Sequence, residues 1–153
     1  MTLYFAYGSN MSRTLMRRHC PAAKEIGTGQ LAGFRFLITT DGYASIVPKA
    51  GETVHGVLWR LTPRDLAALN AFESLDSGLY RRKRLTVETG GERARALVYV
   101  ARKGGKRRPM PGYQERLIAA ARDWGLPPRY VAELARLAPG YHAARPAETG
   151  EIG

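Results

Sequence analysis

Two short stretches hold residue types suited to chemistry: YGSN at residues 7–10 and ESLDSGLY at residues 73–80. In the first, Gly8 follows an aromatic, strand-like run, and glycine lets the backbone turn tightly and approach a ligand closely. The amides that follow lie near a helix start, where positive partial charge gathers. Such a turn can hold a carboxylate or stabilise an oxyanion. The alternative is an ordinary strand-to-helix turn, in which Asn10 or Ser12 caps the helix.

The second stretch begins with Glu73 at the end of an amphipathic helix, one residue after Phe72. Because the C-terminal end of a helix carries partial negative charge, a carboxyl group there keeps its proton more readily. This tuning suits a group that shuttles a proton. The alternative is a surface glutamate that pairs with an arginine of residues 81–84.

The elements that must position these residues can be predicted from local signals. Strand-like segments are residues 3–7, 30–40, 44–48 and 54–61, followed by a hairpin of residues 79–89 and 93–101 about Gly90-Gly91. Helices are expected from Asn10 or Ser12 to about His19, after the N-cap Thr62, and over residues 112–124 and 128–137. Leu66, Leu69 and Phe72 have helical spacing and predict the core stripe of the second helix. Strands dominate the first two-thirds of the chain and helices come late, and this order indicates an α+β architecture rather than alternating βαβ units.

The composition of the 153 residues, 44% hydrophobic and 24% charged, is typical of a globular protein. We expect one domain over residues 1–142 and a polar tail over residues 143–153. No apolar stretch is long enough to cross a membrane, and the N-terminus lacks the pattern of a signal peptide. The single cysteine, Cys20, cannot form an intrachain disulfide and suits the cytoplasm, and with three histidines it shows no metal-ligand spacing.

The net charge of +11 has three interpretations: a nucleic-acid surface, a solvated arginine-rich surface, or a field that attracts an anionic substrate. The densest basic clusters are residues 81–84 and 102–108. We favour the solvated surface and expect no specific nucleic-acid partner, because the clusters lack the interleaved aromatic residues of a stacking platform. The oligomeric state is not indicated by the sequence.

Four motifs in this order resemble the γ-glutamylcyclotransferase family over nearly the whole chain. They are FAYGSNM, then ASI with VHGVLW, then LNAFE with GLY, and finally PGY with GLPPRY. Each motif alone is weakly specific, but four in register are strongly so. The chain departs from the family pattern at Ser74, where glycine is frequent, and at Asn70, where aspartate is common.

The resemblance implies a small mixed β-barrel flanked by helices and intramolecular aminolysis of a γ-glutamyl amide. The substrate's α-amine attacks its own γ-carbonyl, closes the ring of 5-oxoproline and expels an amine or amino acid. Glu73 would be the general acid/base, and the substrate-binding residues would be Tyr7, Gly8, Ser9, Asn10, Tyr80 and Tyr113. For the two tyrosines Tyr80 and Tyr113, core packing is an equal alternative.

The reaction implied by the resemblance requires no metal and no organic cofactor. Two alternatives remain open: a relative that acts on another γ-glutamyl amide, such as a γ-glutamyl amine, and a non-catalytic module that binds a small ligand or nucleic acid. The sequence does not indicate which leaving group the substrate carries.

Overall fold

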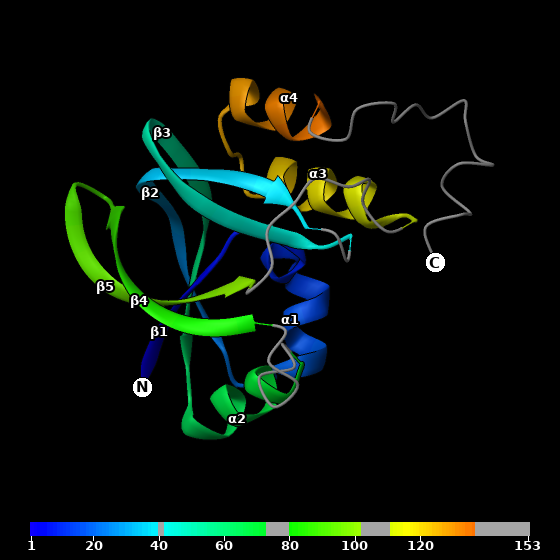
Figure 1. The fold of residues 1–153 in the computed structure, drawn as a ribbon. Coiled ribbons are helices and arrows are strands. Elements are labelled where there is room, and N and C mark those ends of the chain that lie inside the picture. The colour runs from blue at the N-terminus through cyan, green and yellow to red at the C-terminus, as the bar shows by residue number, and fades with distance from the viewer. Residues whose placement is uncertain (40–41, 73–79, 102–110, 137–153) are drawn as a thin grey trace.

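The computed structural model describes residues 1–39, 42–72, 80–101 and 111–136. Five strands close a barrel in the order β1-β3-β2-β4-β5 (Figure 1). They are β1 (Thr2–Ala6), β2 (Lys24–Ile38), β3 (Ala44–Leu61), β4 (Tyr80–Thr89) and β5 (Glu92–Ala101). Neighbouring strands are antiparallel except β1 and β5, which are parallel. The predicted small mixed β-barrel flanked by helices is therefore confirmed.

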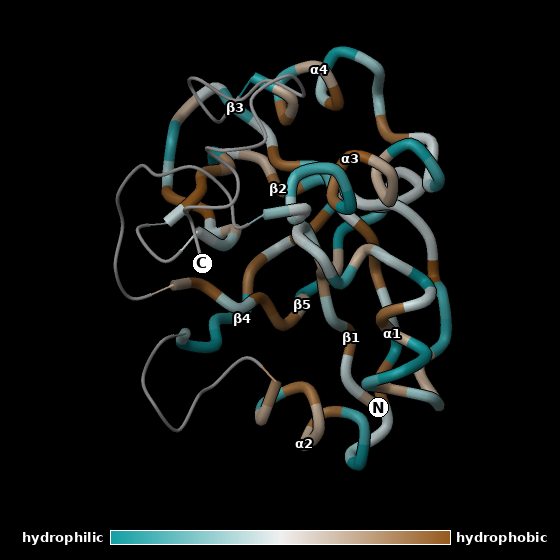
Figure 2. Tube along the Cα trace, turned by 90° about the vertical axis from the view of Figure 1, so that its right-hand side faces the viewer, coloured by the Kyte–Doolittle hydropathy of each residue, from teal (hydrophilic) through white to brown (hydrophobic). Residues whose placement is uncertain are grey.

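The helical elements within the described residues are η1 (Ser9–Met11), α1 (Arg13–His19), α2 (Pro63–Phe72), α3 (Tyr113–Asp123) and α4 (Pro128–Arg136). In Figure 1, α1 and α3 lie on the right side of the barrel, α4 lies above α3 at the top, and α2 lies below the barrel. Figure 2 shows brown, hydrophobic stretches along β5 near the centre of the molecule. Each helix of the described ranges is too short or too polar to cross a membrane. The predicted tail, residues 143–153, lies outside those ranges.

Local capping and turn signals set the boundaries of several elements as expected. The backbone N–H of Leu15 donates to Ser12 Oγ at 3.2 Å, so Ser12 rather than Asn10 is the N-cap of α1. The N–H of Asp65 donates to the Oγ1 of the predicted cap Thr62 at 3.1 Å. The β4–β5 hairpin turns at Gly90 and Gly91, which have φ angles of 56° and 81°.

The prediction of two separate strands at residues 44–48 and 54–61 is wrong, because β3 runs through both. The break in the pattern marks a bulge instead. Opposite Ala32 and Phe34 of β2, the paired residues of β3 jump from Thr53 to Pro48. The extra residues of β3 bend the long β2–β3 hairpin without ending the strand. The partner strand β2 also begins earlier than predicted, at Lys24.

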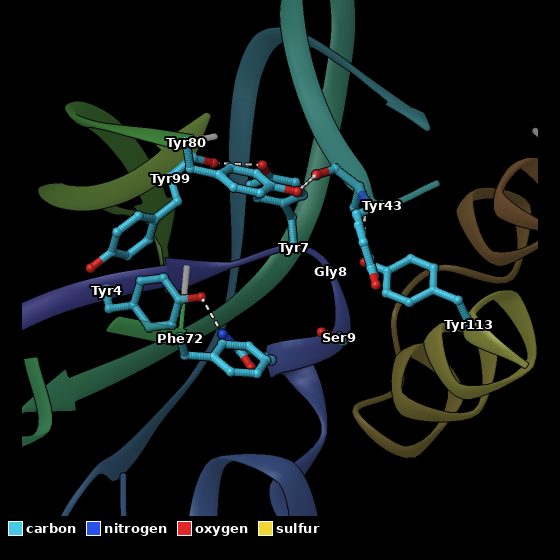
Figure 3. Close-up of a pocket in the computed structure, with 11 residues that line it drawn as sticks. Tyr4, Tyr7, Gly8, Ser9, Tyr43, Phe72, Tyr80, Tyr99 and Tyr113 are labelled. Atoms are coloured by element: carbon cyan, nitrogen blue, oxygen red, sulfur yellow. Dashed lines mark hydrogen bonds between the residues drawn. The ribbon is translucent and has the colours of Figure 1, made fainter. Parts of the chain in front are cut away.

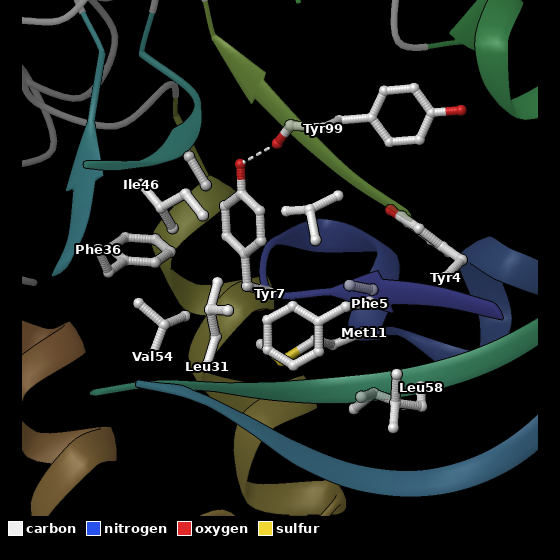
Figure 4. Packing of buried hydrophobic residues seen from close by; sticks show 14 of the residues in the cluster. Tyr4, Phe5, Tyr7, Met11, Leu31, Phe36, Ile46, Val54, Leu58 and Tyr99 are labelled. Carbon is white, nitrogen blue, oxygen red and sulfur yellow. Dashed lines mark hydrogen bonds between the residues drawn. The ribbon is translucent and has the colours of Figure 1, made fainter. Parts of the chain in front are cut away.

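The core fills the barrel and extends under the helices (Figure 4). Its fully buried side chains include Phe5, Val54, Leu58 and Leu69. The predicted core stripe of α2 is right for Leu69 but wrong for Phe72, which is 41% exposed. Phe72 is the last residue of α2, and its side chain lines a cavity rather than the core.

Candidate active site

A cavity of about 340 Å³ lies beside η1, where β1 ends. Figure 3 shows the side chains around it. Its described lining brings together all six residues predicted to bind substrate, namely Tyr7, Gly8, Ser9, Asn10, Tyr80 and Tyr113. They come from the first ten residues, from β4 and from α3. Tertiary structure thus gathers predicted residues that lie more than a hundred positions apart.

The turn after β1 is compact and half-buried at Gly8 and Ser9. The N–H of Met11 donates to the carbonyl of Gly8 and the N–H of Ser12 to the carbonyl of Ser9, both at 3.0 Å. The N–H groups of Gly8 and Ser9 themselves make no hydrogen bond within the described part of the chain. This turn therefore offers two backbone donors on the wall of a cavity, next to the start of a helix.

Gly8 is required by close packing rather than by an unusual backbone angle, since its φ is −113°. A Cβ atom at this position would lie 3.0 Å from the hydroxyl of Tyr113 and 3.1 Å from the Cβ of Ala44. Glycine can be needed in a turn for a positive φ or for the close approach of neighbouring atoms, and at Gly8 the close approach is the reason. The turn can press against α3 and the start of β3 only because residue 8 has no side chain.

Tyr80 and Tyr113 both bind the backbone of Ala44. The hydroxyl of Tyr80 donates to the Ala44 carbonyl at 2.9 Å, and the Ala44 N–H donates to the hydroxyl of Tyr113 at 3.3 Å. Both side chains are also buried. The two interpretations of these tyrosines thus combine: they pack in the core and present an edge to the cavity.

The polar groups of Tyr7 and Asn10 form hydrogen bonds that hold the site together. Tyr7 points into the barrel, and its hydroxyl donates to the carbonyl of Tyr99 at 2.6 Å (Figure 4). The side-chain Nδ2 of Asn10 donates to the hydroxyl of Tyr4 at 3.0 Å. The Asn10 carbonyl accepts from Trp59 Nε1 at 3.1 Å. These contacts fix the ends of the turn that carries the free amides of Gly8 and Ser9.

Five further residues of the described lining were not predicted from the sequence: Tyr4, Tyr43, Ala44, Phe72 and Tyr99. Tyr43 is 39% exposed and packs edge-to-face on Tyr113 with ring centroids 5.6 Å apart. The hydroxyl of Tyr99 donates to Asn70 Oδ1 of α2. Only Tyr4 and Phe72 could have been found by a local signal, since they lie beside the two motifs that already pointed to chemistry.

Glu73, the predicted general acid/base, lies outside the described residues. Both ends of the segment that contains it nevertheless border the cavity: Phe72 precedes residues 73–79 and Tyr80 follows them, and both line the wall.

The described lining carries no charged side chain; it consists of tyrosine, phenylalanine, glycine, serine, asparagine and alanine. Over the same part of the chain, no three histidine, cysteine, aspartate or glutamate side chains gather where they could hold a metal ion. The expectation that no cofactor is needed stays a prediction.

Comparison with known proteins agrees with this architecture. The profile of the family described as "Gamma-glutamyl cyclotransferase, AIG2-like" matches residues 4–125. The chain is 27% identical to the gamma-glutamylcyclotransferase of Bos taurus, over 95% of this chain and 84% of the bovine protein. It is 26% identical to the gamma-glutamylcyclotransferase of Homo sapiens, over 95% of this chain and 84% of the human protein.

Among solved structures, one titled "Gamma-glutamyl cyclotransferase" superimposes with a TM-score of 0.84 at 25% identity. The alignment covers 93% of this chain and 90% of that chain. The chain therefore belongs to the gamma-glutamyl cyclotransferase, AIG2-like family, and it has distant full-length homology to gamma-glutamylcyclotransferases.

Proposed function

We propose that this protein catalyses intramolecular aminolysis of a γ-glutamyl amide and releases 5-oxoproline together with an amine or amino acid. The observation that carries the proposal is the cavity in which the amides of Gly8 and Ser9 lie on one wall, while Phe72 and Tyr80, which flank the segment of Glu73, border it as well. The cavity volume of about 340 Å³ suits a small molecule.

The proposed chemistry needs a base, hydrogen-bond donors that stabilise negative charge, and a substrate bound with its amine close to its own γ-carbonyl. Only the free α-amine is a nucleophile, so Glu73 removes a proton from the α-ammonium and later protonates the leaving nitrogen. The amides of Gly8 and Ser9 bind an anionic oxygen of the reacting substrate. Enclosure by aromatic side chains holds the amine near the γ-carbonyl, and such orientation is worth several kcal/mol in favourable cases, up to about 7–11.

The substitution Glu73→Gln tests the proposal, because glutamine is nearly isosteric and cannot accept the ammonium proton. We expect kcat to fall by about 10²–10⁴-fold with little change in KM, since the proton transfers belong to the transition state. The assay follows 5-oxoproline from a screen of γ-glutamyl compounds. Glu88→Gln is the matched control: Glu88 is exposed on β4, outside the cavity lining, and its nearest described cation is Arg93 at 4.0 Å.

A Glu73→Gln enzyme with nearly wild-type turnover would rule out Glu73 as the base, and Asp76 would be the next carboxylate to test. The binding-module alternative would be favoured if no γ-glutamyl compound gave 5-oxoproline and the protein bound a defined RNA tightly at physiological salt. We expect instead only weak, salt-sensitive nucleic-acid binding that follows from net charge. The cytoplasmic location likewise stays a prediction.

A further inference from the structure

The neutral lining of the cavity raises a question about the part of the substrate that leaves. If the leaving group is an amino acid, it brings a second carboxylate, which must remain in water or meet a cation. The described lining contains no charged residue, so a cation supplied by the described part of the chain would lie just outside that lining. Among the described residues, candidates are found on β4, which begins with Tyr80 of the cavity wall and continues with four exposed basic residues, Arg81, Arg82, Lys83 and Arg84.

The strand register distinguishes Arg82 from its neighbours. Arg82 pairs with Tyr99 of β5 and lies two residues after Tyr80. Side chains alternate along a strand, so Arg82 emerges on the same face as both of these cavity-lining tyrosines. Directly paired residues have Cβ atoms about 4.5–5.5 Å apart. Arg82 therefore has two cavity-lining neighbours, which are Tyr80 along β4 and Tyr99 across the strand pair on β5.

The other basic residues of β4 lie less favourably. Arg81 pairs with Val100 and points to the opposite face. Arg84 shares the face of Arg82 but pairs with Leu97, about 7 Å further along the strand. Arg82 is exposed, and it forms no ion pair with any residue of the described ranges. Its charge is thus available to a ligand as far as the described residues are concerned.

We propose that Arg82 is a specificity-determining residue that binds the carboxylate of the leaving group at the mouth of the cavity, so that γ-glutamyl amino acids are preferred to γ-glutamyl amines. This inference rests on the proposed function. The planar guanidinium presents paired donors that match a carboxylate, and such charge-assisted contacts are stronger than neutral hydrogen bonds. The partly exposed rings of Phe72 and Tyr43 line the same cavity and offer apolar surface to the rest of the leaving group.

The test compares two substrates that differ by one carboxylate, γ-glutamyl-alanine and γ-glutamyl-ethylamine. For each, kcat/KM for 5-oxoproline formation is measured with the wild type, Arg82→Gln, Arg82→Lys and Arg81→Gln. We expect Arg82→Gln to lower kcat/KM for γ-glutamyl-alanine by about tenfold, mainly through KM, and to leave γ-glutamyl-ethylamine nearly unchanged. Arg82→Lys should retain part of the preference for γ-glutamyl-alanine, because lysine keeps the charge but lacks the paired donors of the guanidinium.

Arg81→Gln is the matched control, since it removes the same charge from the adjacent residue on the opposite face. It should leave the ratio of the two kcat/KM values at the wild-type level, which separates direct binding from long-range attraction of anions. The inference is overturned if Arg82→Gln leaves this ratio unchanged, if it lowers kcat/KM equally for both substrates, or if Arg81→Gln shifts the ratio as much. If the wild type forms 5-oxoproline from neither these nor any other γ-glutamyl compounds, the proposed function itself fails, and this inference fails with it.

Discussion

Gly8→Ala adds a single methyl group at the turn that carries the free amides. The added Cβ would lie 3.0 Å from the hydroxyl of Tyr113 and 3.1 Å from the Cβ of Ala44. Optimal contacts between carbon atoms are about 3.5–4.0 Å, so the contact with the Cβ of Ala44 is too short by roughly half an ångström, and the contact with the hydroxyl oxygen of Tyr113 is also tight. Neither neighbour yields easily, because Ala44 is bound through its N–H by Tyr113 and through its carbonyl by Tyr80.

The turn itself must therefore shift away from the cavity wall. Overpacking of this kind costs about 1–3 kcal/mol of unfolding free energy. In a chain of this size each kcal/mol lowers Tm by about 2–4 °C. A displacement of 1 Å at a reacting centre can cost about 10²-fold in rate, so a shift of half that size should lower kcat/KM by about tenfold. Thermal denaturation and the 5-oxoproline assay measure the two effects separately.

Gly51→Ala provides the control for this prediction. Gly51 lies in β3 with a φ of 84° and has no atom within 4 Å of an added Cβ. Alanine there is strained by about 1 kcal/mol without crowding anything, so Tm should fall while kcat/KM is kept. The proposed role of the turn is refuted if Gly8→Ala keeps the wild-type kcat/KM, or if Gly51→Ala loses activity to the same degree.

Two further predictions concern Tyr99 and Cys20. Tyr99→Phe removes the hydroxyl that donates to Asn70 Oδ1 and ties the end of α2 to β5, so we expect a loss of about 1 kcal/mol in unfolding free energy together with lower kcat. A double-mutant cycle with Asn70→Ala should show strong coupling between the two substitutions, and independent effects would contradict this hydrogen bond. Burial raises the pKa of the Cys20 thiol to about 11, with a smaller contribution from Asp65. Only roughly one thiol in a thousand is then ionised at pH 8, so iodoacetamide should label Cys20 far more slowly in the native protein than in urea. Equal labelling rates would show that the thiol is accessible in the native protein.

Local chemistry made several elements predictable from the sequence. Thr62 before Pro63 and Ser12 before α1 supply side-chain oxygens that bind the free amides of a first helical turn, whatever the rest of the chain does. Gly90-Gly91 allows the tight turn between β4 and β5. The strand β3 was not predictable in the same way, because its continuity through residues 49–52 depends on the pairing with β2 on both sides of the bulge.

By itself the sequence determined the α+β class and the turn of residues 7–10, because these depend on residue type and on neighbours in the chain. Only the tertiary structure decided which side chains enclose the cavity. Tyr7 and Tyr99 are 92 residues apart, and Ala44 and Tyr113 are 69 apart, yet each pair is joined by a hydrogen bond. Hydrophobic burial is non-directional, so an aromatic residue does not specify its partners. The closing of the barrel and the docking of α3 assign them, and with them the walls of the site.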